Sequence, residues 1–290
     1  MSVLPAGTLD LNVQTNDPFS SSMRLARGST IDLALPWAFD GTLNVNTEAG
    51  AFVTQPAAPA TIAGAKMTQT GGTIRLDQDV DHLVFEAPFE ATGGTIDFED
   101  GSITFNAPAT IGAGVDFRVN DIGGNAVAIE VNAPVVVGDE DWNWDGNRAD
   151  TRITINDGGS LGVELAETHN FYAGQLELNG GELEVVSFLE WSLLSSAQLR
   201  VAGIPESRIG GSRFGMAGGS LVIEPGASLL MEAEALGDDF DPDQVFLGGS
   251  MVVDGVLTLS RNTTEWRGTA VSGEGLIRQG DCRVTDDQTI

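Results

Sequence analysis

The chain has 290 residues, 41% of them hydrophobic, and a formal net charge of −28 from 42 acidic and 14 basic residues. So negative a field repels phosphate backbones and anionic lipid, which excludes nucleic-acid and membrane-surface binding as expected functions. The apolar share supports a continuous core and argues against wholesale disorder, and no run approaches the ~18 apolar residues of a membrane-spanning helix.

A Gly-Gly pair followed by an alternating apolar strand recurs along the chain. The copies begin at Gly71, Gly93, Gly158, Gly180, Gly218 and Gly248. The first two copies start 22 residues apart (71 to 93), and so do the next two (158 to 180). A period of this size is typical of a solenoid, in which each unit buries its apolar face only against its neighbours.

Period two along a strand sorts the side chains of each copy. The residues expected to point inward are Ile74, Leu76, Ile96, Phe98, Leu161, Val163, Leu183, Val185, Leu221, Ile223, Met251 and Val253. The outward position next in register holds Asp77, Glu99, Glu164, Val186, Glu224 and Asp254. If the Gly-Gly pair marks the same corner of every turn, these outward residues form one acidic column. Arg118 is then expected beside Glu99.

The spacing predicts an all-β chain forming a single-stranded parallel β-helix of short strands. Antiparallel sheets would show two-residue hairpin turns at intervals of roughly 8–12 residues, which the repeat lacks. A β-sandwich or jelly roll is the alternative architecture. We expect one domain over residues 1–290 with the repeat core at about 28–280. Irregular spacing later in the chain predicts long lateral loops over 186–217 and 224–247.

The densest acidic motif spans residues 139–150. Alternating oxygen donors followed by Gly146 are the pattern that a calcium-binding turn requires. An EF-hand would carry a bidentate glutamate where Arg152 stands, so the site would be of another type. The expected ligands are Asp141, Asn143, Asp145 and Asp150. An Asx-rich surface turn without metal is the alternative. A similar motif without glycine spans 238–243.

Two tryptophans, Trp142 and Trp144, flank Asn143 inside this acidic loop. Aromatic faces beside carboxylates are suited to stacking on sugar rings while the acids bind hydroxyls, which predicts a carbohydrate-binding pair. The alternative is that the indoles fold back as a cap on the core.

The sequence contains few features that indicate an enzyme. His82 and His169 lack metal-ligand spacing, Lys66 is the only lysine, and Cys282 has no partner for an internal disulfide. We therefore expect no catalytic residues and no required cofactor, with Ca²⁺ as the one ion that the acidic loops suit. The first residues, Met1–Pro5, contain no signal-peptide pattern, and we expect the chain to be a segment of a larger protein.

The Gly-Gly-Thr/Ser-Ile/Leu-x-Leu/Val/Phe unit with Asn/Asp-rich corners resembles the autotransporter-associated β-strand repeats of autotransporter passengers and other bacterial surface proteins. The likeness covers most of residues 28–280. It implies a right-handed parallel β-helix that acts outside the cell as a stalk, spacer or adhesive face. The repeat implies no catalytic residues.

These observations predict a non-enzymatic extracellular structural or adhesion segment. Its expected partners are a polysaccharide or the surface of a host or neighbouring cell, and exposed solenoid ends predict end-to-end self-association. The alternatives are a polysaccharide-active β-helix (a lyase, a hydrolase or a tailspike-like depolymerase) and a carbohydrate-binding module.

Overall fold

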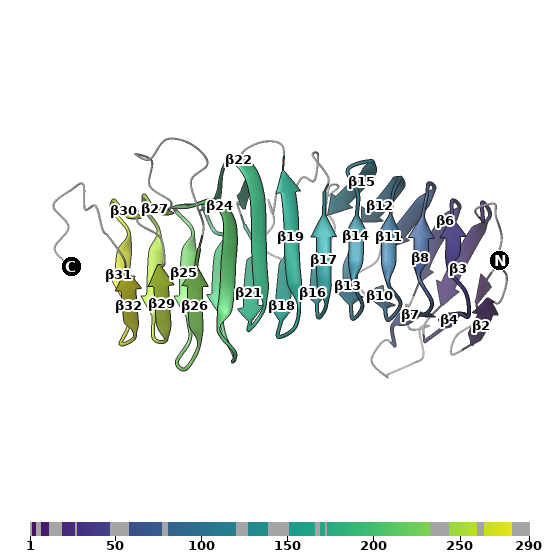
Figure 1. The fold of residues 1–290 in the computed structure, drawn as a ribbon, viewed down its shortest axis with the longest axis horizontal. Coiled ribbons are helices and arrows are strands. Elements are labelled where there is room, and N and C mark those ends of the chain that lie inside the picture. The colour runs from purple at the N-terminus through teal and green to yellow at the C-terminus, as the bar shows by residue number, and fades with distance from the viewer. Residues whose placement is uncertain are drawn as a thin grey trace. The chain divides into compact units, whose positions relative to one another are not determined.

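The computed structural model describes residues 2–3, 7–11, 19–26, 28–46, 58–76, 81–119, 127–138, 151–165, 169–171, 173–232, 244–259 and 264–279. The chain forms two compact units, unit 1 (Met1–Asn143) and unit 2 (Trp144–Ile290). Every regular element in the described residues is a β-strand (Figure 1). The single domain predicted over residues 1–290 stays a prediction.

Unit 1 is a three-sided parallel solenoid in which each turn adds one strand to faces A, B and C in that order. Face A contains β1 (Ser2–Val3), β3 (Ser22–Ala26), β6 (Thr42–Asn46), β9 (Thr73–Leu76), β12 (Gly94–Phe98) and β15 (Val115–Val119). Face B contains β2 (Thr8–Leu11), β4 (Thr30–Leu33), β7 (Ala60–Gly64), β10 (His82–Phe85), β13 (Gly101–Phe105) and β16 (Val127–Val131). Face C contains β5 (Trp37–Phe39), β8 (Met67–Gln69), β11 (Phe89–Ala91), β14 (Ala109–Ile111) and β17 (Pro134–Val137).

Unit 2 also adds three strand segments per turn, on faces D, E and F. Face D contains β18 (Arg152–Asn156), β21 (Gln175–Asn179), β23 (Gln198–Val201), β25 (Ser220–Ile223), β28 (Ser250–Val253) and β31 (Ala270–Ser272). Face E contains β19 (Ser160–Leu165), β22 (Glu182–Leu194), β24 (Ser207–Ala217), β26 (Ser228–Met231), β29 (Val256–Leu259) and β32 (Leu276–Gln279). Face F contains β20 (His169–Phe171), the second halves of β22 and β24, β27 (Gln244–Phe246) and β30 (Thr264–Trp266).

The predicted parallel β-helix is confirmed. Strands within each unit pair in parallel, as between β9 and β12 or between β21 and β23. The antiparallel contacts among the described residues are two isolated bridges, Asn156 with Gly180 and Leu194 with Gly218. A sandwich or jelly roll would need antiparallel ladders, and so that alternative is wrong.

The alternation of inward and outward residues is confirmed as well. The twelve residues predicted to point inward are each at most 4% exposed. In register they stack into interior columns, one of which runs Met23, Leu43, Ile74, Ile96, Phe117 along face A. Burying a side chain of this size stabilises the fold by about 1.5–3 kcal/mol.

The expectation that Gly-Gly marks one corner is wrong. The pairs at 71 and 93 precede strands of face A, those at 158 and 180 precede face E, and those at 218 and 248 precede face D. The glycines are needed at any corner where the chain takes a positive φ against the previous turn. A Cβ on Gly249 (φ 81°) would lie 2.0 Å from the carbonyl oxygen of Gly219. The Gly-Gly pair thus indicates a tight corner but does not indicate which face follows that corner.

The predicted acidic column is therefore not a single column. Glu99 follows a strand of face A, Glu164 lies on face E, and Glu224 follows a strand of face D, where Asp254 follows the next strand along. Asp77 lies outside the described residues. Dispersal over three faces keeps most of these carboxylates apart.

The lateral loop predicted over 186–217 is also wrong. These residues form the second half of β22, all of β23 and all of β24. The corner between β23 and β24 has no Gly-Gly pair. It is made by Gly203 (φ 78°), Ile204 and Pro205, with a cis peptide bond before the proline. The loop predicted over 224–247 contains β26 and β27, and its residues 233–243 lie outside the described residues.

Aromatic side chains stack on one another from turn to turn in both units. In unit 2, Trp191, Phe214, Phe246 and Trp266 follow one another along face F. The ring centroids of successive pairs are 4.8, 6.0 and 4.5 Å apart. In unit 1, Phe85 stacks on Phe105 at 5.4 Å. Such pairs add about 0.5–1.5 kcal/mol beyond their buried area.

Candidate functional site

The residues predicted to bind calcium or carbohydrate lie outside the described residues. Asp141, Trp142, Asn143, Trp144, Asp145 and Asp150 all fall in 139–150, and the second acidic motif falls in 233–243. Both sites stay predictions. Elsewhere, the described part of the chain contains no group of three or more histidine, cysteine, aspartate or glutamate side chains placed to hold a metal ion.

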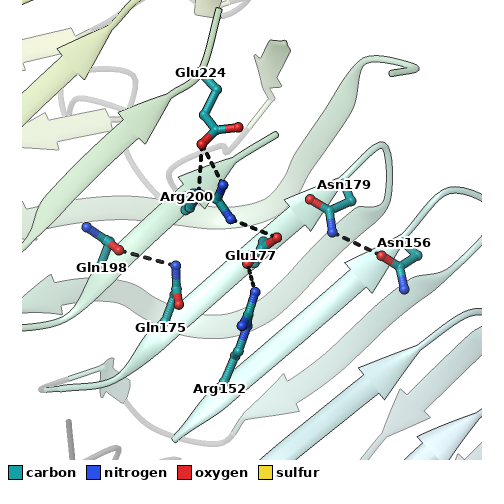
Figure 2. Close-up of polar contacts among 8 residues, drawn as sticks. All are labelled: Arg152, Asn156, Gln175, Glu177, Asn179, Gln198, Arg200 and Glu224. Atoms are coloured by element: carbon teal, nitrogen blue, oxygen red, sulfur yellow. Dashed lines mark hydrogen bonds and ion pairs between the residues drawn. The ribbon is translucent and has the colours of Figure 1, made fainter. Parts of the chain in front are cut away.

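The most developed polar cluster lies on the outward side of face D in unit 2. We call it the Glu177 ladder, and it comprises Arg152 on β18, Glu177 on β21, Arg200 on β23 and Glu224 just after β25 (Figure 2). Its position follows from period two, because the residues on either side of Glu177, Leu176 and Leu178, both point into the core. Parallel pairing in register then brings the outward residues of successive turns together.

Glu177 is held between two arginines from the flanking turns. Its Oε1 accepts from Arg200 Nη1 at 3.0 Å, and its Oε2 accepts from Arg152 Nη2. Arg200 continues the chain of charges, because its Nη2 lies 2.5 Å from Glu224 Oε1 and its Nε lies 3.0 Å from the same atom. Figure 2 shows these dashed contacts running from Arg152 to Glu224. Charges therefore alternate in sign over four strands.

Burial and pairing act in opposite directions on Glu177. Its side chain is 6% exposed, and this burial by itself would raise the pKa of the carboxyl group. Hydrogen bonding and charge from Arg152, a hydrogen bond from Asn179, and the charge of Arg200 outweigh it, so the pKa is lowered. The pKa of Arg200 is raised, chiefly by its hydrogen bond to Glu224. Glu177 and Arg200 are thus both charged at neutral pH.

Amide pairs stand on both sides of the Glu177 ladder. Gln175 Nε2 donates to Gln198 Oε1 at 3.3 Å, and Asn179 Nδ2 donates to Asn156 Oδ1 at 3.1 Å. Both pairs join residues in direct register on neighbouring strands. They place the carboxylate of Glu177 in a polar surround in which each turn contributes a donor or an acceptor.

The chemistry open to this cluster is limited. A carboxylate with a lowered pKa is a poor proton donor, and both of its oxygens already accept from arginine. The arrangement is instead suited to fixing the register of successive turns, because each side chain meets its partner only when the strands pair as they do here. The exposed members, Arg152 and Glu224, are 50% and 37% exposed.

Ladders of the same design occur on other faces. On face E, Arg208 contacts Glu182 at 3.0 Å and Glu232 at 2.5 Å. On face A, Arg75 lies 3.5 Å from both Asp97 and Glu99. Arg208 therefore bridges the two turns that flank its own, whereas Arg75 contacts two carboxylates of one neighbouring turn.

The expectation that Arg118 lies beside Glu99 is wrong. The register places Ile96 opposite Phe117, so that Arg118 stands opposite Asp97. The guanidinium of Arg118 contacts Asp116 on its own strand at 2.5 Å. The alignment in sequence is shifted by two residues from the pairing in space, because Val115 takes the position opposite Gly94. Glu99 meets Arg75 instead.

The two histidines belong to different units. His82 lies on β10 in unit 1, where its Nε2 is 3.0 Å from Thr104 Oγ1. Burial lowers the pKa of His82, and the charge of Glu130 only partly opposes that effect. His169 lies on β20 in unit 2.

The Glu177 ladder could not be found by local sequence reasoning. Arg152 and Arg200 are 48 residues apart in sequence and show no cluster there, although both contact Glu177. The available signal was the offset of 23 residues that relates Arg152 to Gln175 and Gln175 to Gln198. That offset differs from the 22-residue Gly-Gly period, and only the paired strands reveal it.

Comparison with known proteins adds no assignment: no family model, no curated protein and no solved structure matches this chain. Within the described residues, no helix is long and apolar enough to cross a membrane.

Proposed function

We propose that this chain is a non-enzymatic structural segment of a larger extracellular protein, serving as a stalk, spacer or adhesive face. The observation that supports the proposal is that outward charged side chains form ion pairs between successive turns, most extensively around Glu177. Charged groups that neutralise one another across turns stiffen a rod and leave little free chemistry for turnover.

The acidic character of the chain supports a location outside the cell. A net charge of −28 favours solubility and mutual repulsion of side faces, and the resemblance to surface-protein repeats agrees with this. A calcium ion at 139–150 would add stability without adding catalysis, and glycan contact through Trp142 and Trp144 would make the segment adhesive.

The test is a polysaccharide panel, acidic and neutral, incubated with the full chain in the presence of calcium and then of chelator. We expect no fall in viscosity and no new reducing ends on any member. A Trp142→Ala/Trp144→Ala variant tests adhesion in a retention assay on the same glycans, and circular dichroism checks that the variant folds. Calcium-dependent chain cleavage would overturn the proposal and direct attention to the carboxylates near Arg152.

A further inference from the structure

Nine outward side chains form a regular array on face C of unit 1 and on the corner that precedes it. They belong to three consecutive turns, whose strands β11, β14 and β17 lie side by side (Figure 1). Glu90 stands opposite Thr110, and Thr110 stands opposite Val136. We call the set the proline array. Its three rows are Glu86, Pro88 and Glu90; Asn106, Pro108 and Thr110; and Asn132, Pro134 and Val136.

Alternation with buried residues points each row of the proline array outward. In the middle row, Ala107 and Ala109 are 7% and 3% exposed, whereas Asn106, Pro108 and Thr110 are exposed. The other two rows follow the same pattern, and their members are exposed or half-exposed. Because paired parallel strands hold the rows in place, the array is preorganised, and a ligand that binds it pays little for ordering the protein.

The array combines an apolar strip with a hydrogen-bonding strip. The three pyrrolidine rings follow one another at the strand spacing of about 4.8 Å. Beside them, Asn106 Nδ2 donates to Glu86 Oε1 at 2.7 Å, and Asn132 Nδ2 donates to Asn106 Oδ1 at 2.8 Å. A side-chain amide has two N–H donors and an oxygen with two lone pairs, so these contacts use only part of the capacity of Asn106.

This combination suits a sugar ring, which presents an apolar C–H face and hydroxyl groups at its rim. The rings of the prolines offer contact area to the C–H face, and the amides and the carboxylate of Glu86 offer partners to the hydroxyls. The rise per turn is close to the length of one pyranose residue in an extended chain. A polysaccharide that runs along the axis of unit 1 therefore meets the same chemistry at every turn.

Charge selects a neutral ligand for the array. Seven of its nine side chains are uncharged, and Glu90 forms an ion pair with Lys66. The chain as a whole has a net charge of −28, which repels acidic polysaccharides and further copies of the same chain. A neutral polymer approaches without that repulsion.

We propose that the proline array binds a neutral polysaccharide, with pyranose rings stacked on Pro88, Pro108 and Pro134 and hydroxyl groups bound by Asn106 and Asn132. The site differs from the tryptophan pair in residues 139–150. The inference rests on the adhesive role in the proposed function, and it names a surface and a ligand class for that role.

The test is affinity electrophoresis of the full chain in native gels that contain galactomannan, xyloglucan or hydroxyethyl cellulose, with alginate as the acidic comparison. We expect at least one neutral polymer to retard the chain. Pro108→Ser/Pro134→Ser removes two rings and should weaken binding about tenfold or more. Pro225→Ser is the matched control, because Pro225 is an exposed proline in the turn between β25 and β26 of unit 2. It should bind as the unaltered chain does, and circular dichroism checks that both variants fold.

A second variant, Thr110→Asp, places a carboxylate in the array without removing a ring, and it should weaken binding as well. Migration unchanged in all three neutral gels, retardation by alginate alone, or equal binding by the double proline variant and its control would overturn the proposal. Loss of binding in Trp142→Ala/Trp144→Ala with no loss in the double proline variant would also overturn it. Each of these results leaves the structural role intact. New reducing ends would instead overturn the proposed function, and weaker binding by the double proline variant would still support the array.

Discussion

The two units make their corners differently. In unit 1 each turn consists of three short separate strands, for example β9, β10 and β11, of four, four and three residues. In unit 2, β22 and β24 run for 13 and 11 residues and pass from face E into face F without interruption. The pairing of β22 with β24 shifts register between Val185 and Glu190. A corner therefore requires a local backbone adjustment and does not require a loop.

The outward faces differ in what they bury. On face B of unit 1, the outward residues Val84 and Thr104 are 7% and 6% exposed. On face D of unit 2, the comparable outward position holds Glu177, 5% exposed overall and ionised. Apolar and hydroxyl side chains such as Val84 and Thr104 can be buried by packing against their neighbours. A buried carboxylate such as that of Glu177 also requires partners of opposite charge. On face D, Arg152 and Arg200 are those partners of Glu177.

The largest expected effect comes from the bend in β24. Gly211 has φ 89°, and a Cβ there would lie 2.1 Å from the carbonyl oxygen of Val185. We expect Gly211→Ala to lower the free energy of unfolding of unit 2 by about 3 kcal/mol. Gly210→Ala is the control, because its Cβ would meet nothing within 4 Å, and it should change stability by no more than about 0.5 kcal/mol. Urea unfolding followed by tryptophan fluorescence measures both. Equal stabilities would show that the bend does not depend on glycine.

The next effect concerns the buried acid. Glu177→Gln keeps the volume but leaves Arg152 and Arg200 facing a neutral amide, and we expect a loss of about 1–2 kcal/mol, reduced by the solvent exposure of both arginines. Glu224→Gln removes a more exposed carboxylate and should cost less, about 0.5 kcal/mol or under. Denaturant unfolding of these two variants, of Arg200→Gln, and of each carboxylate variant combined with Arg200→Gln gives the coupling energies. A coupling with Glu177 no larger than that with Glu224 would contradict the ladder described here.

The smallest expected effect is a difference in pH dependence between the units. Burial lowers the pKa of His82 below its usual 6.5, so the unfolded chain takes up the proton first and unit 1 loses stability as pH falls below 6.5. The lowered pKa of Glu177 also makes the folded state less stable as pH falls, but at lower pH. Its stabilisation is complete above pH 4.5, the usual pKa, and is lost as pH falls through the pKa of Glu177 in the folded state. Hydrogen exchange from about pH 7 to about pH 5 should therefore show opening of unit 1 before unit 2. The slope in unit 1 should vanish in His82→Gln, and its persistence would assign it to other groups.

Part of the candidate site could be predicted from the sequence. The alternation around Leu176, Glu177 and Leu178 marks Glu177 as an outward residue on a strand. Its partners Arg152 and Arg200 could not be predicted. They lie 25 and 23 positions away in sequence and contact Glu177 only because of the register of the parallel strands. The mistaken pairing of Arg118 with Glu99 had the same origin, a shift of two residues that conserves the inward-outward pattern.

The sequence by itself determined which side chains face the core and that the strands stack as a parallel solenoid, because period two is a local property of the extended backbone and the repeat length forbids hairpins. Only the tertiary structure decided which face each strand joins, where β22 and β24 continue through a corner, and which charges meet. Those features depend on how many residues each turn uses, from 20 between Leu83 and Ile103 to 31 between Thr30 and Thr61. The glycine that permits a tight corner is the same residue on every face, so it carries no information about which face follows.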